Sequence, residues 1–371
     1  MDDATETYSR GRRLIVERPL LVVVGLFAVL LVFDFIQRLV TGNLRVSYVG
    51  SLIWTGLMRG LIIGLAGIGL SMTYSILNFA NFSHGDYITS GAFSGWAVTY
   101  LIAGLGSNNI AGLLLVGAGG TVYASSLGIT IATTPVAVIL GMLFAGAFTV
   151  VLALLIDRIV YRPMRDAEGI SLLITSIGVA FVLRYLVVFV FSAESRGTTA
   201  IQDIPSWNLL LWDGTVRVTA HDLTILVCTV GLMLGVHVLL QRTKLGKAMR
   251  AMADNEDLAR VTGIPTEQVI RWTWIIGGAL TGISGFLLVL WRGTIIFNFG
   301  WLLLLPIFAA VILGGIGSIY GAILGGLVIG LTWNLAIIWI PSDFGRAAAF
   351  GMMILILLFK PQGLFAGRTT A

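Results

Sequence analysis

Residues 52–77 read LIWTGLMRGLIIGLAGIGLSMTYSIL and contain a single charged side chain, Arg59. An α-helix needs about 20 predominantly apolar residues to cross the hydrocarbon core of a bilayer, so this stretch is long enough to span it. Similar apolar runs recur along almost the whole chain, which is 57% hydrophobic and 11% charged, with a mean hydropathy of +0.96. A soluble protein of 371 residues would need a larger charged surface. We therefore predict an all-α integral membrane protein, a polytopic helical bundle.

The apolar runs predict ten membrane spans in a single transmembrane domain over residues 1–371. The spans are Leu20 to Val40, Leu52 to Leu77, Ile88 to Leu105, Pro135 to Ile156, Ile170 to Phe191, Asp222 to Leu240, Trp272 to Trp291, Trp301 to Gly317, Tyr320 to Ile340 and Arg346 to Phe359. The uncharged segment Ile110 to Thr133 is rich in Gly and Ser. A hairpin, a re-entrant pair and a further crossing all remain open for it, and we place it outside the ten spans as an outer insertion.

The distribution of basic residues predicts the orientation of the chain. With both termini on one side, that side receives Arg10, Arg12, Arg13, Arg18, Arg158, Arg162, Arg165, Arg242, Lys244, Lys247, Arg250, Arg260, Arg271, Lys360 and Arg368, and the other receives Arg45, Arg196, Arg217, Arg292 and Arg346. The positive-inside rule makes the first side cytoplasmic. We expect a multi-pass plasma-membrane protein with a cytoplasmic tail at residues 1–19 and a retained first span. The net charge of +5 then reflects topology, and nucleic-acid binding is not indicated.

The longest polar segment, residues 241–271, includes RTKLGKAMRAMADNEDLARVTGIPTEQVIR from Arg242 to Arg271. Asp254 or Asn255 is suited to the N-cap of a helix, and Gly263 followed by Pro265 supplies a stop. The resulting helix of roughly eight residues would be about 12 Å long, too short to cross a bilayer. We predict that it is a cytoplasmic element that docks on a partner protein. The alternative is a solvated loop helix.

A second irregular segment, NFANFSHGD from Asn78 to Asp86, joins two predicted spans. Unwound backbone at membrane depth is tolerated where protein buries it or where it lines a watery cavity. The candidate residues of a translocation path are Asn78, Asn81, Ser83, His84 and Asn298. The alternative is that the polar residues between Asn78 and Asp86 cap helix ends, with Ser83 or Asp86 as the N-cap of the next span.

Few charged side chains lie inside the predicted spans. Asp34 and Arg38 stand at i and i+4 and are expected to pair on one helix face. Arg59 and Arg184 either face a polar interior or extend to the membrane surface, because a charge in lipid is costly.

Small residues recur at helical spacing in the spans. The GxxxG pairs are Gly60/Gly64, Gly91/Gly95, Gly231/Gly235, Gly278/Gly282, Gly321/Gly325 and Gly326/Gly330. Such pairs let helix backbones approach closely in lipid, so we expect tight packing within the bundle more than a dedicated dimer interface. The runs from Gly314 to Ser318 and Gly325-Gly326 predict a break or hinge near the cytoplasmic side.

The sequence contains no convincing catalytic or metal-binding pattern. The three histidines are scattered, and Gly246-Lys247 lacks the upstream glycine and the following Ser or Thr of a phosphate-binding loop. We therefore expect neither an enzyme nor a bound cofactor or metal. If ATP drives this protein, another subunit hydrolyses it.

Five segments carry a resemblance to a known family. They are LGKAMRAMADNEDLARVTGI from Leu245 to Ile264, YRPMR from Tyr161 to Arg165, NFANFSHGD from Asn78 to Asp86, AVILGGIGS from Ala310 to Ser318 and KPQGLF from Lys360 to Phe365. Taken in their order along the chain, from about Leu52 to Arg368, they resemble the branched-chain amino acid ABC transporter permeases of the LivH type. The first span and residues 110–133 look like additions to that pattern.

The resemblance implies the membrane subunit of an importer of branched-chain or related amino acids. The implied partners are a second, homologous permease subunit, two ATPase subunits, an extracytoplasmic substrate-binding protein and membrane lipid. The short polar helix would be the coupling helix that docks on an ATPase, with the residues Asp254, Asn255, Glu256, Asp257, Leu258, Arg260, Val261 and Gly263. Permeases for urea, short amides or aromatic acids are the alternative within the superfamily. A stand-alone secondary transporter is the alternative from another class, although the spans lack the paired carboxylates that a coupling-ion site needs.

Overall fold

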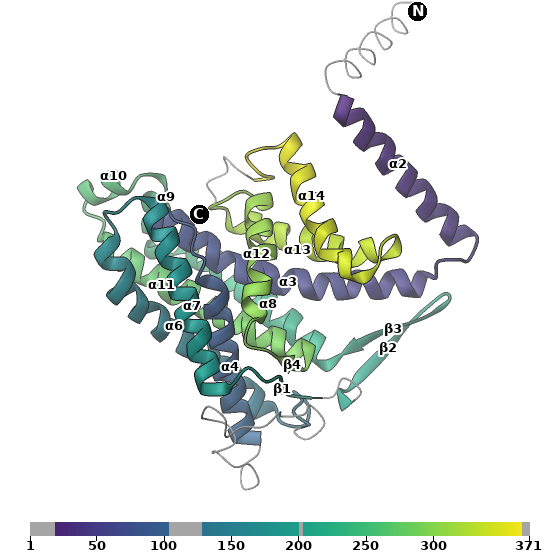
Figure 1. Cartoon of the computed structure of the whole chain (residues 1–371), viewed down its shortest axis with the longest axis horizontal. Helices are drawn as coiled ribbons and strands as arrows, with labels where there is room; N and C mark the ends of the chain where they lie inside the picture. Colours follow the sequence, from purple (N-terminus) through teal and green to yellow (C-terminus); the bar gives the residue numbers. More distant parts are fainter. Residues whose placement is uncertain (1–18, 104–127, 200–202, 366–371) are drawn as a thin grey trace, which may run out of the picture. The chain divides into compact units, whose positions relative to one another are not determined.

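The computed structural model describes residues 19–103, 128–199 and 203–365, and this part of the chain is predominantly helical (Figure 1). The longer helices are α2 (Pro19–Val40), α3 (Val46–Leu77), α4 (His84–Ala103), α6 (Pro135–Ile156), α7 (Gly169–Phe191), α8 (Ala220–Arg242), α11 (Thr266–Arg292), α12 (Phe299–Gly314), α13 (Ile319–Leu335) and α14 (Gly345–Phe359). Each of the ten predicted spans falls on one of these helices. The predicted insertion at residues 110–133 and the N-terminal tail lie almost entirely outside the described residues.

Two of the ten helices differ from an ordinary membrane span. Among the described residues, eight helices are long and apolar enough to cross a membrane. The exceptions are α4, which begins with polar residues such as His84 and Asp86, and α12, which has only 16 residues. The predicted break after α12 is confirmed, whereas the prediction of a break at Gly325-Gly326 is wrong, because α13 continues through both glycines. The helix ends at Gly314, and Gly315 and Gly317 have φ values of 101° and 84°, which glycine adopts without strain.

The described residues also form two small two-stranded sheets, which the prediction of an all-α fold did not include. Strand β1 (Arg196–Gly197) pairs antiparallel with β4 (Thr294–Ile295), and β2 (Ser206–Leu211) pairs with β3 (Gly214–Thr219). The indole N–H of Trp96, on α4, donates to the Gly197 carbonyl at 3.0 Å. This contact places the C-terminal half of α4 beside β1. We call this end of the bundle the β1–β4 end.

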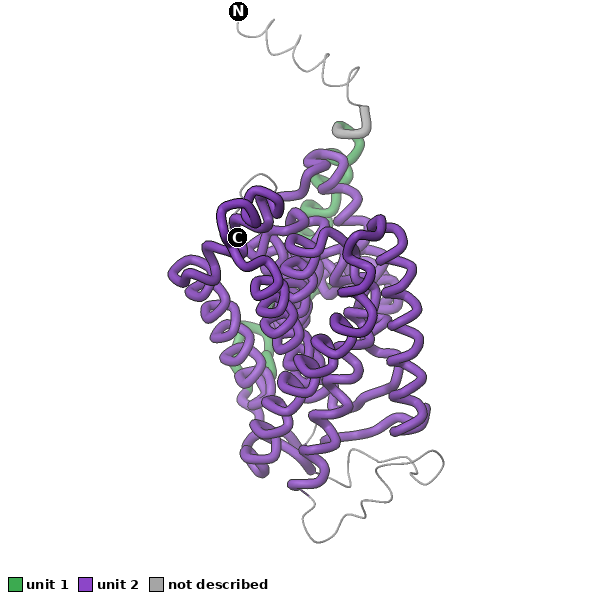
Figure 2. Tube along the Cα trace, turned by 90° about the vertical axis from the view of Figure 1, so that its left-hand side faces the viewer, with its two compact units in different colours: residues 1–51, 208–217 green, residues 52–207, 218–371 purple. Residues whose placement is uncertain are grey.

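The chain divides into two compact units (Figure 2). Unit 1 comprises residues 1–51 and 208–217, and unit 2 comprises residues 52–207 and 218–371. Within unit 1, the predicted pair Asp34–Arg38 is present at 2.8 Å. The Asp213 carboxylate accepts the backbone N–H groups of Val46 and Ser47, the latter at 2.8 Å, so it caps the first turn of α3.

Unit 2 has a glycine seam between α3 and α13. A Cβ atom added at Gly60 would lie 2.8 Å from the Leu327 Cα, and one added at Gly326 would lie 2.5 Å from the Gly64 amide nitrogen. The two backbones are therefore in contact at successive turns. This confirms packing within the bundle as the use of these GxxxG residues. The Gly231/Gly235 pair on α8 is different, because nothing lies within 4 Å of a Cβ added at either position.

This difference gives a matched test of the seam. We expect Gly326→Ala and Gly330→Ala each to destabilise the protein by about 1–3 kcal/mol, because the added methyl meets backbone that has no room to move. Gly231→Ala and Gly235→Ala should be neutral or stabilising, because alanine is the better helix former by about 1 kcal/mol. Thermal unfolding of the four detergent-solubilised variants measures this. Equal effects at both pairs would show that helix propensity, and not close packing, decides the outcome.

The rest of unit 2 packs as two groups of helices around the buried part of α3. In one group, α4, α6 and α11 pack against one another, and in the other, α12, α13 and α14 do (Figure 1). The largest buried side chains of the described residues include Trp96, Tyr161 and Trp274. The rings of Tyr161 and Trp274 stack with centroids 5.6 Å apart. The core therefore extends from α11 to the segment after α6, where the polar sites lie.

Candidate functional site

The polar loop after α8 contains two short helices. These are α9 (Lys244–Asp254) and α10 (Glu256–Val261). The expectation of one helix of about eight residues starting at Asp254 or Asn255 was therefore only partly correct. Asp254 is the last residue of α9, and α10 has six residues. The first basic flank is itself helical, because Thr243 supplies an N-cap for α9 by accepting the Gly246 N–H at 3.0 Å.

Both ends of α10 are formed by local cap chemistry. The Asn255 side chain accepts the Leu258 N–H at 2.9 Å, so Asn255 is the N-cap. At the other end, Gly263 has φ +86° and its N–H donates to the Arg260 carbonyl at 3.1 Å, while the Ile264 N–H donates to the Ala259 carbonyl at 3.0 Å. This pair of bonds is a Schellman motif, which favours glycine at this position. The predicted stop at Gly263 is confirmed.

The surface of α10 combines apolar and charged side chains. Leu258 is 60% exposed and Val261 is 85% exposed, and they lie three residues apart on one side of the helix. Ala259 is buried and anchors the opposite side. Glu256 and Arg260 form an i,i+4 ion pair at 2.9 Å, and Asp257 is exposed. Leu258 and Val261 therefore form an exposed apolar pair among the charged side chains of α10.

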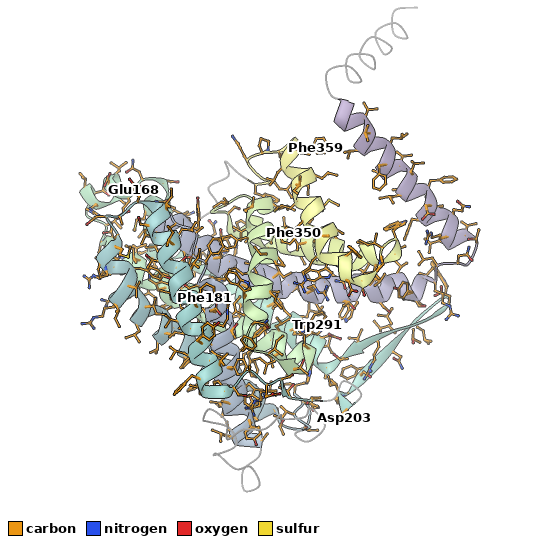
Figure 3. All side chains as sticks on the ribbon, viewed as in Figure 1. Glu168, Phe181, Asp203, Trp291, Phe350 and Phe359 are labelled. Atoms are coloured by element: carbon orange, nitrogen blue, oxygen red, sulfur yellow. The ribbon has the colours of Figure 1, made fainter. Side chains whose placement is uncertain are left out.

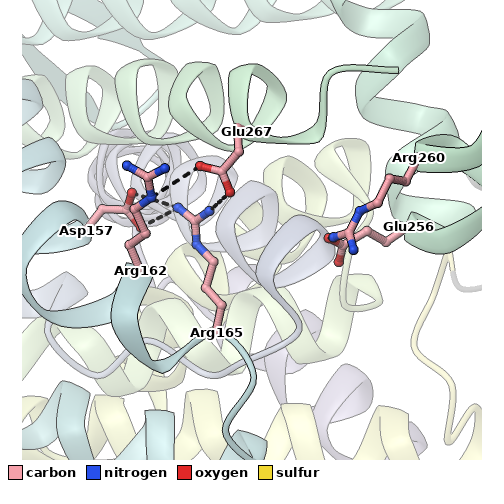
Figure 4. A network of polar contacts seen from close by, with 6 residues as sticks. All are labelled: Asp157, Arg162, Arg165, Glu256, Arg260 and Glu267. Atoms are coloured by element: carbon pink, nitrogen blue, oxygen red, sulfur yellow. Dashed lines mark hydrogen bonds and ion pairs between the residues drawn. The ribbon is translucent and has the colours of Figure 1, made fainter. Parts of the chain in front are cut away.

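A charged network lies beside α10 (Figure 4). The Arg165 guanidinium donates to both oxygens of Asp157, at 3.0 and 3.3 Å, and also to Glu267 in the first turn of α11. Arg162 approaches Glu267 at 3.6 Å. Asp157 lies in a π-helical turn, Asp157–Tyr161, that extends α6, and Arg162 opens the 3₁₀ turn Arg162–Met164. The network thus ties the end of α6 to the start of α11.

A cavity of about 440 Å³ separates this network from α10. Its lining residues come from the end of α3 and the segment after it, the turn after α6, the start of α7, α10 and α11: Ile76, Leu77, Phe79, Tyr161, Arg162, Arg165, Asp166, Leu172, Glu256, Asp257, Arg260, Glu267 and Ile270. We call this end of unit 2 the α10 end. The sequence analysis did not identify Asp157 or Glu267 as site residues. The signal in the sequence was the segment YRPMR, which contains Arg162 and Arg165. The Arg165 partner Asp157 belongs to the turn that extends α6, and its other partner, Glu267, is 102 residues away on α11.

A second polar site lies deep in the bundle, where α4 and α12 begin. The His84 Nε2 atom is 3.0 Å from the Ala66 carbonyl oxygen of α3. Ala66 is eleven residues before the end of α3 at Leu77, which corresponds to about 16 Å along the helix. The chain therefore turns back into the bundle after α3, and α4 starts inside it and runs to the β1–β4 end.

Helix α12 starts at the same depth and runs in the other direction. A Cβ atom added at Gly85 would lie 2.8 Å from the Gly300 carbonyl oxygen, and the Gly300 N–H donates to the Thr89 hydroxyl at 3.2 Å. From there α12 extends to Gly314, close to the α10 end. This follows from Gly317, three residues later, where an added Cβ atom would lie 3.5 Å from Ser75 in the last turn of α3. We call residues 81–86 and 298–301 together the helix junction. Two helix N-termini meet there inside the protein.

The helix junction contains most of the predicted path residues. Asn81, Ser83 and His84 are buried, and the Asn81 Oδ1 atom accepts the Ser83 hydroxyl at 2.6 Å and the Tyr161 hydroxyl at 3.3 Å. Asn298 directly precedes α12, and its side-chain oxygen is buried with no hydrogen-bond partner among the described residues. Asn78 lies elsewhere. It is exposed, has φ +53° and ends α3 by donating its N–H to the Tyr74 carbonyl at 2.9 Å.

The expected capping roles are partly present. Ser83 occupies the position before α4, and the Asn81 side chain also accepts the Ser83 backbone N–H at 3.1 Å. Asp86 is not an N-cap, because it lies within the first turn of α4.

Asp86 instead pairs with Arg184 of α7. The Arg184 Nε and Nη2 atoms donate to the two carboxylate oxygens of Asp86 at 3.1 and 2.9 Å, and Asp86 is fully buried. The guanidinium also stacks on Trp301 at 4.5 Å and on Phe181 at 5.2 Å, the latter labelled in Figure 3. Arg184 therefore faces the helix junction and does not extend to the membrane surface. Arg59 lies elsewhere, 4.4 Å from the ring centre of Trp333 and 5.7 Å from that of Trp291 (Figure 3).

Comparison with known proteins agrees with this architecture. A family model described as the permease component of branched-chain amino acid transport systems matches residues 52–357. The match begins at Leu52, so residues 1–51 with α2 precede it.

Individual relatives align over most of the chain. The high-affinity branched-chain amino acid transport system permease protein BraD of Pseudomonas aeruginosa is 29% identical over 83% of this chain and 94% of its own length. The corresponding protein LivH of Escherichia coli is 28% identical over 84% of this chain and 93% of its own length. The autoinducer 2 import system permease protein LsrD of Yersinia enterocolitica is 28% identical, but over only 34% of this chain and 40% of its own length.

These relatives are transport permeases, so the chain is a multi-pass membrane component of a transport system and not an enzyme. The family model covers most of the sequence, and the chain therefore belongs to the family of permease components of branched-chain amino acid transport systems.

Proposed function

We propose that this chain is the membrane-spanning permease subunit of an ABC importer that carries branched-chain or related amino acids. The observation that carries the proposal is α10. It is a capped six-residue helix at the end of the bundle, with Leu258 and Val261 exposed. A groove in an ATPase subunit would cover these two side chains, and the energy of ATP binding and hydrolysis would enter the permease there.

The network beside α10 supports a route for this coupling. A shift of α10 would change the shape of the 440 Å³ cavity that α10 lines together with Arg165 and Glu267. The ion pair between these two residues connects the end of α6 to the start of α11. Tyr161 connects that segment to the helix junction through Ser83, at 2.8 Å. A movement at α10 would therefore change the packing at the junction, as alternating access requires.

The helix junction is the proposed translocation path, through Asn81, Ser83, His84 and Asn298, with Asn78 at its α10 end. Helix N-termini carry partial positive charge, and interrupted helices with such ends bind anionic groups in many transporters. Two N-termini and Arg184 lie there with the single carboxylate of Asp86. This balance of charge favours a solute with a carboxylate group.

The proposal includes an orientation and a set of partners. The α10 end would face the cytoplasm together with both chain termini, residues 1–371 would form a single permease domain, and the loop 241–271 would contact the ATPase. The complete importer would contain two ATPase subunits, a second homologous permease subunit and an extracytoplasmic binding protein. A permease for other small polar solutes would have the same subunits and differ in the binding protein.

The test is to purify the tagged, detergent-solubilised chain from its own host and to identify the proteins that accompany it by mass spectrometry. Recovery of an ATPase and a second permease, followed by ATP-dependent leucine uptake in vesicles loaded with the complex, is the expected result. Recovery of the chain alone, together with uptake that needs no ATP, would establish the stand-alone carrier instead.

Within this proposal, Asn81 should be essential for transport. We expect Asn81→Leu to lower leucine uptake at least tenfold. It removes the acceptor of the buried Ser83 and Tyr161 hydroxyls, and since only one of these can donate to the other, one buried donor is left unpaired at a cost of about 1–3 kcal/mol. Uptake by the reconstituted complex measures this. Asn208→Leu is the control, since it makes the same substitution at an exposed position of β2, away from the proposed path, and it should retain uptake. Normal uptake by a monodisperse Asn81→Leu complex would remove Asn81 from the path.

A further inference from the structure

A second cavity lies next to the Arg165–Glu267 bridge. It has a volume of about 510 Å³ and lies between the end of α6, the turn that follows it and the first turns of α11. Its lining residues are Leu154, Asp157, Arg158, Arg162, Arg165, Glu267 and Arg271. In contrast to the 440 Å³ cavity, the described residues that line it include none from α10. The surface that we assign to the ATPase therefore does not use it.

The cavity has an excess of positive charge. Its lining contains four guanidinium groups and two carboxylates, which leaves two positive charges uncompensated. Both carboxylates are already bound to Arg165. Within the described part of the chain, Arg158 and Arg271 have no ion pair or hydrogen bond. Arg165 itself retains one buried donor, Nε, without an acceptor. An anion with several acceptor oxygens would complement these donors.

The surroundings of the cavity are those of a membrane surface. It lies at the ends of two candidate spans, residues 135–164 and 266–292. Val151, Leu155 and Ile159 form an exposed apolar row along α6, each 51–65% exposed, and Leu155 and Ile159 directly follow the lining residues Leu154 and Arg158. Trp272, next to Arg271, is 46% exposed. Exposed tryptophan beside basic residues is typical of the boundary between headgroups and acyl chains.

We infer that this cavity binds the phosphate group of an anionic phospholipid, with the acyl chains lying along the exposed row of α6. Guanidinium groups bind phosphate oxygens through paired N–H donors, and Arg158, Arg162 and Arg271 offer such donors around one space. Basic pockets between helices on the cytoplasmic side are suited to anionic headgroups. The assignment to the cytoplasmic leaflet rests on the orientation in the proposed function, whereas phosphate binding does not.

Native mass spectrometry of the purified full chain, exchanged into detergent with equal amounts of phosphatidylglycerol and phosphatidylcholine, tests the inference. We expect the wild type to retain phosphatidylglycerol preferentially. The double variant Arg158→Gln/Arg271→Gln should lose roughly thirty-fold in this preference, since each basic residue near a lipid surface contributes about fivefold. Lys244→Gln/Lys247→Gln is the matched control. It removes two exposed positive charges from α9 on the same side and should keep the preference.

The other outcomes each overturn the inference. Equal loss of preference in both double variants would mean that net charge alone attracts the lipid. Equally tight binding of inorganic phosphate would assign the cavity to a free anion. Retained lipid preference in the arginine variant would show that Arg158 and Arg271 do not bind the lipid phosphate.

A lysine variant distinguishes loss of lipid binding from a folding defect. Arg158→Lys/Arg271→Lys keeps the charge and should restore most of the preference, so a folding defect of the glutamine variant is recognised. The permease is measured alone, so a negative result for ATP-driven transport leaves the lipid result unaffected.

Discussion

Arg184→Gln is expected to destabilise the protein by about 3–5 kcal/mol, because it leaves the carboxylate of Asp86 buried without its partner. The guanidinium contributes two charge-assisted hydrogen bonds and also stacks on Trp301. Asp86→Asn should cost a similar amount, because it leaves the buried cation unpaired. Thermal unfolding of the detergent-solubilised chain, followed by tryptophan fluorescence, measures both variants.

Two comparisons show whether burial is the cause. The double variant Asp86→Asn/Arg184→Gln should recover most of the lost stability, because it leaves no unpaired charge inside the bundle. Arg38→Gln removes the same kind of partner from the exposed pair Asp34–Arg38, whose side chains are 38% and 42% exposed, respectively. It should change stability by less than about 1 kcal/mol. If Arg184→Gln is as mild as Arg38→Gln, the Asp86–Arg184 pair does not hold α4 and α7 together.

The second large effect is expected at α10. We expect Leu258→Asp/Val261→Asp to lower ATP-driven uptake at least tenfold and to reduce co-purification of the ATPase. Full burial of a leucine or valine side chain in a partner's groove contributes about 1.5–3 kcal/mol, and the aspartates would add a desolvation penalty. Uptake and ATP hydrolysis by the reconstituted complex, measured together, separate loss of docking from loss of transport.

The design of this experiment rests on the exposure of α10. Leu258 and Val261 are 60% and 85% exposed, so neither substitution disturbs the core of the permease. Gln268→Asp adds a negative charge at an exposed position in the first turn of α11 and should leave coupling unchanged. Gly263→Val provides an independent variant, because φ +86° is strained for a β-branched residue and the Schellman motif would be lost. Full coupling in both α10 variants would show that the ATPase docks elsewhere.

Much of the site could be predicted because it depends on residues close together in sequence. The stop of α10 at Gly263 followed from glycine and proline chemistry, and the N-cap was correctly limited to two neighbouring residues, of which Asn255 is the one used. The length of α10 was overestimated. Periodicity did not reveal that Asp254 completes a separate helix, α9, because a single extended residue, Asn255, divides the two.

The ion-pair partners of Arg184 and Arg165 could not be predicted from neighbouring residues. Arg184 and Asp86 are 98 residues apart in sequence, and Arg165 and Glu267 are 102 apart. Asp86 was considered only as a helix cap, since local sequence offers no other use for it. The start of α4 inside the bundle was also hidden, because a polar connection of six residues is equally compatible with a loop at the surface.

The sequence by itself determined the class of protein, the order of the ten long helices that the structure describes, the break after Gly314 and the ends of α10. These features depend on the length of apolar runs and on hydrogen bonds between neighbouring residues, which are local properties. Only the tertiary structure decided that α3 and α13 touch along their glycines, that α4 and α12 begin at one helix junction, and that the two buried or half-buried arginines find carboxylates on other helices. In a membrane bundle nearly every helix face is apolar, so sequence pattern does not reveal which faces meet. Close backbone contact and the pairing of the few buried charges select the arrangement.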